Sequence, residues 1–269
     1  MNFHTDEWIM DRVREHYNEA LEHFPEDRIV GLFYQGSANY GLDYIGSDVD
    51  TKLIVTPTFE DIAMNRKAVS TTHIRKNEEH IDFKDIRLYI QTFRKQNLNF
   101  LEILYTPYCI VNPLYKNEWN RLVTAREDIA HYAPVQAIKS MRGIAKEKYF
   151  AMEHHYPSRM EWINKFLYDP KQLHHLLRVQ EYIARYISGE SYKDCLISLQ
   201  PEYLKKVKVG HHTLEEAREI ANSAITHIDE MCDEYLKTCS AEVDKEVDAL
   251  LDDVQYNIMK IAIKKEFDK

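Results

Sequence analysis

Apolar residues recur at helical spacing over residues 5–24, and this pattern predicts an amphipathic helix at the start of the chain. Thr5 or Asp6 is the expected N-terminal cap, and Pro25 is expected to end the helix. The residues predicted to face the core are Ile9, Val13, Leu21 and Phe24.

Short apolar runs rich in β-branched and aromatic residues follow, and they predict strands. The predicted strands cover residues 28–34, 49–56 and 78–84, and the helices among them cover 58–67 and 86–95. This alternation predicts an α/β unit with a small mixed sheet and flanking helices over residues 1–113.

Strand signals fade after about residue 113, and helical periodicity takes over. Pro134 can begin a helix, and Thr213 with Glu216 forms a capping box. A long apolar stripe consists of Val243, Val247, Leu250, Val254, Ile258 and Ile261. The stripe indicates core packing, with a dimer seam as the alternative, so residues 114–269 are predicted to form an all-helical C-terminal domain in an α+β protein.

Candidate chemistry lies where the first predicted strand ends. Gly36 lets the backbone approach a ligand closely, and the Ser37 hydroxyl with exposed N–H groups suits a triphosphate; Gly41 would close the short helical turn that follows. Asp48 and Asp50 open the next strand on one face, about 6.6 Å apart at Cα, with Val49 pointing into the core. Neighbouring carboxylates that stay ionised imply a divalent cation, and hard oxygen ligands favour Mg²⁺ or Mn²⁺.

Four segments, in this order, resemble the polymerase-beta-like nucleotidyltransferase superfamily. The match is tighter with a branch of poorly characterised nucleotidyltransferases proposed to act in RNA repair, some of them carried by phages. The segments are GSANYGL (36–42), SDVD (47–50), NLNFLEILYTP (97–107) and YDPKQLHHLLR (168–178). The resemblance implies a nucleotidyltransferase core, two catalytic metal ions bridged by Asp48 and Asp50, and an NTP such as ATP as substrate. It also implies that Lys171, His175 and Arg178 contact the nucleotide or the acceptor.

Enzymes of this superfamily use a third carboxylate on a neighbouring strand, and Asp82 is our candidate for this catalytic and metal-binding role. If residues 78–84 form a strand, Asp82 shares a face with His80 and Lys84. Glu78 or Glu79 is the alternative, whereas Asp85 is better explained as a helix N-cap.

The sequence therefore predicts transfer of a nucleoside monophosphate from an NTP to a hydroxyl, with an RNA end or tRNA favoured as acceptor. Three alternatives stay open: a catalytically silent nucleotide-binding regulator or antitoxin-like protein, an enzyme that nucleotidylates a protein, and a helical scaffold. The net charge of −9 means that a nucleic-acid partner needs a local basic face, for which Lys139, Arg142 and Lys146 are candidates. Scattered cysteines and the lack of a long apolar run predict a cytoplasmic protein without a membrane span.

Overall fold

The computed structural model describes residues 4–44 and 46–268, and these divide into two compact units. The α/β unit comprises residues up to Asn39, Asp43–Ala133 and Val243–Lys269. The helical unit comprises Tyr40–Leu42 and Pro134–Glu242. The sequence placed the division near residue 113 and assigned everything after it to one domain. The division differs in the structure because the helices up to residue 133 and the last helix pack on the α/β unit.

A five-stranded mixed sheet forms the centre of the α/β unit, in the order β3-β4-β2-β1-β5. β2 and β4 pair in parallel, whereas β1 pairs antiparallel with β2 and β5, and β3 pairs antiparallel with β4. The strands are β1 (Ile29–Gln35), β2 (Asp50–Val55), β3 (Ser70–Ile74), β4 (His80–Asp85) and β5 (Cys109–Val111). Three of them match predicted strands, whereas the edge strands β3 and β5 were not predicted.

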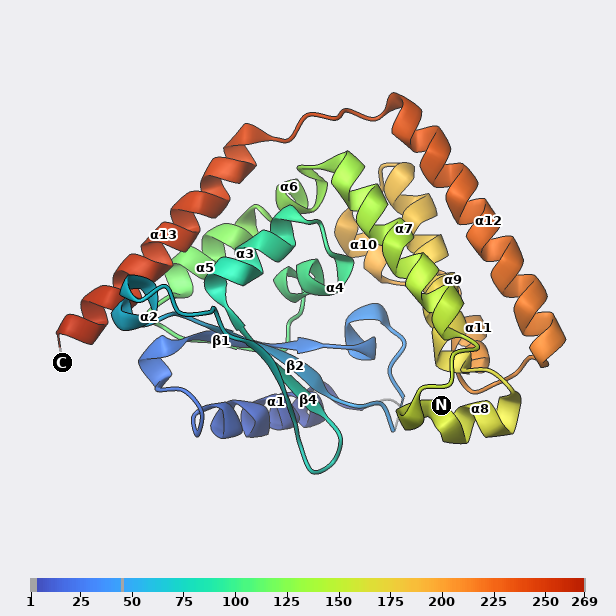
Figure 1. Ribbon diagram of the computed structural model, residues 1–269, viewed down its shortest axis with the longest axis horizontal. Coiled ribbons are helices and arrows are strands. Elements are labelled where there is room, and N and C mark those ends of the chain that lie inside the picture. Colours follow the sequence, from blue (N-terminus) through green and yellow to red (C-terminus); the bar gives the residue numbers. More distant parts are fainter. Residues whose placement is uncertain (1–3, 45, 269) are drawn as a thin grey trace. The chain divides into compact units, whose positions relative to one another are not determined.

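Helix α1 (Asp6–Ala20) covers one face of this sheet (Figure 1). Thr5 caps it, since the Thr5 hydroxyl accepts the Trp8 N–H at 3.2 Å. Ile9 and Val13 are buried against the sheet as predicted, together with Ala20. Leu21 lies beyond the helix end and is exposed, contrary to its predicted inward position.

Helices on the other side of the sheet include α3 (Ile86–Arg94), which packs on β2 and β4. Asp85 is its N-cap as predicted, because its Oδ1 accepts the Arg87 N–H at 2.8 Å. The remaining helices before residue 133 are α2 (Phe59–Ala63), α4 (Leu98–Leu101), α5 (Lys116–Thr124) and α6 (Arg126–His131).

The last helix, α13 (Lys245–Phe267), also belongs to the α/β unit, where it contacts α3 and α5. Its Asp248 accepts from Arg94 at 2.7 Å, and its Asp253 pairs with Arg121 at 2.7 Å. Of the predicted apolar stripe, Val247, Val254 and Ile258 are buried, whereas Leu250 and Ile261 are half-buried and Val243 precedes the helix and is exposed. The buried residues are Val247, Leu251, Val254, Ile258 and Ala262.

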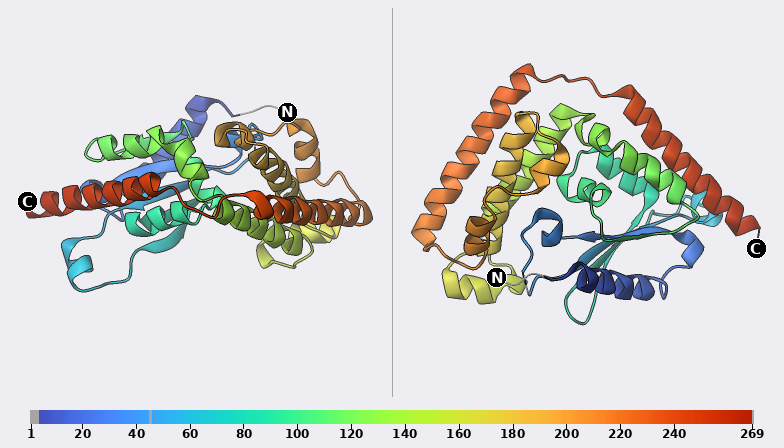
Figure 2. Two further views of the ribbon diagram at one scale, coloured as in Figure 1. Left: turned by 90° about the horizontal axis from the view of Figure 1, so that it is seen from above. Right: turned by 180° about the vertical axis from the view of Figure 1, so that it is seen from behind.

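The helical unit is built round α9 (Pro170–Ile187), which contacts four other helices of this unit, α7, α10, α11 and α12. Figure 2 shows α9 beside α7 (Pro134–Ala151) and α12 (Leu214–Thr238). The other helices are α8 (Met160–Phe166), α10 (Tyr192–Leu196) and α11 (Pro201–Lys208). The predicted capping box of Thr213 and Glu216 begins α12. The protein is thus α+β, with a mixed sheet followed by a helical C-terminal region.

Within residues 4–44 and 46–268, no helix is both long enough and apolar enough to cross a membrane.

Candidate functional site

The Gly36-Ser37 turn follows β1 and packs on the side chain of Tyr34. The buried Tyr34 hydroxyl accepts the Ala38 N–H at 3.1 Å. A Cβ on Gly36 would lie 2.6 Å from that hydroxyl, so only glycine leaves room for the tyrosine. Residues Ser37–Tyr40 form the predicted helical turn, which Gly41 closes with a φ of +68°. The turn is therefore fixed by packing rather than by its own hydrogen bonds alone.

Asp50 lies at the same end of the sheet as this turn. It is the first residue of β2 and pairs with Gln35, the last residue of antiparallel β1. Its side chain is 44% exposed, and its Oδ1 accepts the His80 N–H at 2.9 Å. A half-exposed carboxylate thus stands next to the strand end from which Gly36 and Ser37 continue.

Asp48 precedes β2 instead of opening it, although the sequence placed both acids on one strand end. The residue is exposed and lines an open pocket of ≈ 490 Å³ together with Ser47, Trp8 and Arg12. Val49 between the two acids is buried as predicted. The two aspartates therefore flank a core residue that fixes the start of β2.

Asp82 has the predicted orientation on β4, where Ile81 and Phe83 are buried and the alternate residues His80, Asp82 and Lys84 are half-buried. Its partners, however, are protein side chains. Oδ2 accepts from Lys52 Nζ at 2.9 Å, and Oδ1 accepts from the Thr72 hydroxyl at 2.6 Å. Burial opposes ionisation of Asp82, but the charge of Lys52 and these hydrogen bonds prevail and lower its pKa.

Two lysines and an aromatic ring complete the surroundings of Asp82. The Nζ atoms of Lys52 and Lys84 lie 4.3 and 4.1 Å from the centroid of the Phe100 ring. Burial and the neighbouring Lys52 charge lower the pKa of Lys84. Sequence reasoning missed Lys52, although its position two residues after Asp50 in a strand places it on the same face.

Glu79, an alternative third carboxylate, belongs to a buried ion network. It pairs with Arg12, with His16 at 3.0 Å and with Arg75 at 2.9 Å. These partners overcome the effect of burial and hold its pKa well below the usual range. Glu78, the other alternative, is exposed and adopts a φ of +66°. We therefore assign Glu79 a structural role.

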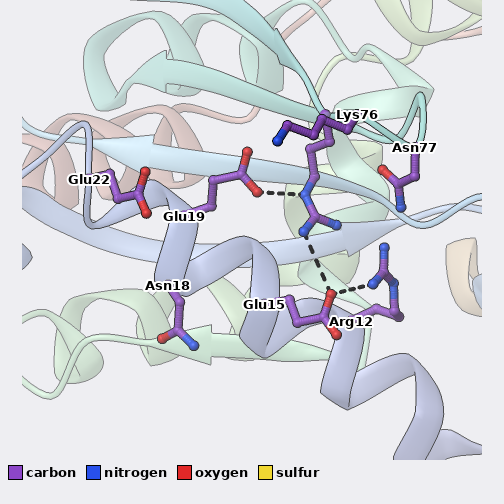
Figure 3. A pocket seen from close by; sticks show the side chains of 8 residues that line it. Arg12, Glu15, Asn18, Glu19, Glu22, Lys76 and Asn77 are labelled. Carbon is purple, nitrogen blue, oxygen red and sulfur yellow. Dashed lines mark hydrogen bonds and ion pairs between the residues drawn. The ribbon is translucent and has the colours of Figure 1, made fainter.

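A charged cavity of ≈ 630 Å³ lies between α1 and the loop that joins β3 to β4 (Figure 3). Arg75 pairs there with Glu19 at 2.7 Å and with Glu15 at 3.6 Å, and Arg12 pairs with Glu15. The lining residues are Arg12, Glu15, Asn18, Glu19, Glu22, Arg75, Lys76 and Asn77. We regard this cavity as part of the ion network round Glu79.

A metal centre with three carboxylates is not assembled in the described part of the chain. There, no three side chains of His, Cys, Asp or Glu are grouped so that they could hold a metal ion. Asp48 and Asp50 are accessible oxygen donors, whereas both oxygens of Asp82 accept hydrogen bonds from side chains. The donor chemistry of the first two residues fits a hard divalent cation, and the contacts of Asp82 do not.

The other predicted nucleotide contacts lie on α9 of the helical unit. Lys171, His175 and Arg178 are half-buried there, and burial lowers the pKa of His175. The Arg178 guanidinium lies 3.7 Å from the centre of the Tyr40 ring, so Arg178 also packs against the motif segment that belongs to this unit.

The candidate basic stripe on α7 is largely paired with acidic residues of α12. Arg142 pairs with Asp229 at 2.5 Å and with Asp233 at 2.7 Å, and Lys146 lies 3.2 Å from Asp229. Lys139 is exposed. The main part of this stripe therefore joins two helices.

Comparisons with known proteins add little to these observations. No protein-family model matches the chain, and no curated protein matches it. Among solved structures, a nucleotidyltransferase-like protein from Exiguobacterium sibiricum aligns over 84% of this chain and 78% of its own, with 11% identity and a TM-score of 0.32.

Proposed function

We propose that this protein is a metal-dependent nucleotidyltransferase that moves a nucleoside monophosphate from an NTP to a hydroxyl acceptor, with an RNA end or tRNA favoured. The pairing of Gln35 with Asp50 carries the proposal, because it joins the Gly36-Ser37 turn and a half-exposed carboxylate at one end of the sheet. The four-segment resemblance supports the same activity and the preference for RNA.

Asp48 and Asp50 would hold a Mg²⁺ or Mn²⁺ ion in this proposal. Mg²⁺ needs only one or two carboxylates when substrate phosphates and water supply the other oxygens. When bound, the ion would neutralise phosphate charge and lower the pKa of the attacking hydroxyl. The close backbone approach at Gly36 and the Ser37 hydroxyl would hold the phosphates.

The reaction then depends on positioning. The acceptor oxygen attacks the α-phosphorus, and a new P–O bond forms as the bond from the α-phosphorus to the bridging oxygen breaks. Pyrophosphate leaves with that electron pair, and the acceptor proton passes to water. Lys171, His175 and Arg178 would contact the nucleotide or the acceptor.

The acceptor can be tested by incubating the purified full chain with Mg²⁺, each α-labelled NTP in turn, and separate RNA, tRNA or protein acceptors. We expect label on RNA or tRNA and none with Asp50→Asn. Label on protein alone would instead assign a protein nucleotidyltransferase. Equal nucleotide binding by both forms without transfer to any acceptor would favour the silent regulator.

A further inference from the structure

Three residues from neighbouring strands form a row across the sheet. Thr72 of β3 pairs with Asp82 of β4, and Asp82 in turn pairs with Lys52 of β2. Paired residues on adjacent strands point to the same face. The two hydrogen bonds described for Asp82 therefore follow directly from the strand register.

The burial of the two charged members of this row is unequal. The Lys52 side chain is 4% exposed, whereas that of Asp82 is 35% exposed. A buried ammonium group is tolerated only when a counter-charge and hydrogen bonds compensate for lost hydration. Asp82 is the carboxylate bonded to Lys52, so Lys52 depends on Asp82 more than Asp82 depends on Lys52.

We infer that Asp82 is the counter-ion that positions Lys52, and that Lys52 supplies the fixed positive charge next to the candidate metal site in place of a second divalent cation. The metal would then be held by Asp48 and Asp50 without Asp82. This inference rests on the proposed function for its link to the metal, whereas the pairing of Lys52 with Asp82 stands by itself.

The local charge favours this role. Lys52, Lys84 and Asp82 together carry one net positive charge when all three are ionised, and both lysines lie against Phe100. A divalent cation on Asp82 would add two positive charges and compete with Lys52 for the same oxygen. The Lys52 ammonium already neutralises the charge of the Asp82 carboxylate. Its positive charge would also attract substrate phosphate.

The first test compares the thermal stability of three variants of the full chain. Asp82→Asn should lower the melting temperature by roughly 5–10 °C, because it leaves the buried Lys52 without its counter-charge. Lys52→Met should lower it by less than about 3 °C, since the partly exposed Asp82 can still be hydrated. The double variant should be more stable than Asp82→Asn alone.

If the double variant instead loses the sum of the two single decreases in melting temperature, Lys52 and Asp82 do not depend on each other. Glu234→Gln, which breaks the exposed pair with Lys237, is the matched control and should change little.

The second test measures Mn²⁺ affinity by calorimetry with a saturating NTP analogue that cannot be cleaved at the α-phosphorus, after subtraction of the Mn²⁺ bound by the free analogue. Asp82→Asn should bind Mn²⁺ within about twofold of wild type, whereas Asp50→Asn should bind at least about tenfold more weakly. An equal loss in both variants would refute our assignment of Asp82 and leave the proposed function intact. If wild type binds no Mn²⁺, the proposed metal-dependent function is wrong, and so is the role of Lys52 in place of a second cation. The pairing of Lys52 with Asp82 is still tested by the melting temperatures of the two single variants and the double variant.

Discussion

Asp50 and Asp82 lie on the same face of neighbouring strands, yet their surroundings differ. Asp50 is next to the glycine turn, and its side chain is 44% exposed. Its Oδ1 accepts the His80 backbone N–H and lies 3.4 Å from Nδ1 of the His80 ring. Both oxygens of Asp82 accept from side chains, one of them a buried lysine. The same residue type on one sheet face can thus be available to a ligand or taken up by the protein, and its partners decide which.

Replacing Asp50 should produce the largest effect on activity. Asp50→Asn keeps the hydrogen bond to His80 but removes the negative charge, so the rate of nucleotidyl transfer should fall roughly thousandfold with little change in stability. The measurement is the steady-state rate at saturating Mg²⁺. Asp11→Asn, which alters an exposed pair with Arg14, serves as the control and should keep wild-type activity. Wild-type activity of Asp50→Asn would contradict the role of Asp50 as a metal ligand, and with it the contrast between Asp50 and Asp82.

Adding a methyl group at Gly36 should have the next largest effect. Gly36→Ala would bring Cβ to 2.6 Å from the hydroxyl of the buried Tyr34, at a residue whose φ is +154°. We expect a loss of about 1–3 kcal/mol in the free energy of unfolding and roughly tenfold slower transfer. Gly143→Ala is the matched control, because nothing lies within 4 Å of its added Cβ and α7 should gain about 0.5–1 kcal/mol. Equal behaviour of the two variants in chemical denaturation would contradict the role given to Tyr34.

The ion network on the opposite face predicts a particular pH dependence. The pKa of Glu79 is lowered on folding, so its ion pairs stabilise the protein above the unfolded-state pKa of about 4.3. That contribution should be lost as the pH falls below this value toward the folded-state pKa. Glu79→Gln should therefore lower the melting temperature at pH 7 and flatten its dependence on pH between about 5 and 3. A profile as steep as that of wild type would show that other carboxylates dominate acid unfolding.

The smallest effect is expected from removing the Tyr34 hydroxyl. Tyr34→Phe leaves the ring packed but takes away the acceptor for the Ala38 N–H, at a cost of about 1 kcal/mol in stability. Urea unfolding measures this loss. Tyr256→Phe on the exposed side of α13 should be neutral. If both substitutions are neutral, packing alone supports the glycine turn.

Local chemistry made much of this molecule predictable. The parity of β4, the cap at Asp85 and the capping box before α12 follow from residues within a few positions of one another. The motif turn and the burial of Val49 also follow from local pattern.

Features that depend on long-range pairing could not be predicted. Strand β3 is a polar, mostly exposed edge strand, so it lacks the apolar alternation that marks a half-buried strand. The stripe on α13 indicates that the helix packs, but no local pattern indicates that it returns to the α/β unit. The role of Asp82 depends on the register of β2 against β4, which brings Lys52 beside it.

We propose that the site near Asp50 transfers a nucleoside monophosphate. The test follows an NTP labelled at the α-phosphate and the same NTP labelled at the γ-phosphate. Each is incubated with Mg²⁺ and with the acceptor that the labelling assay described under Proposed function identifies. We expect α-label in the acceptor and an equal amount of γ-label in pyrophosphate, with neither product from Asp50→Asn. Transfer of γ-label to the acceptor, or release of γ-label as inorganic phosphate alone, would contradict the proposal.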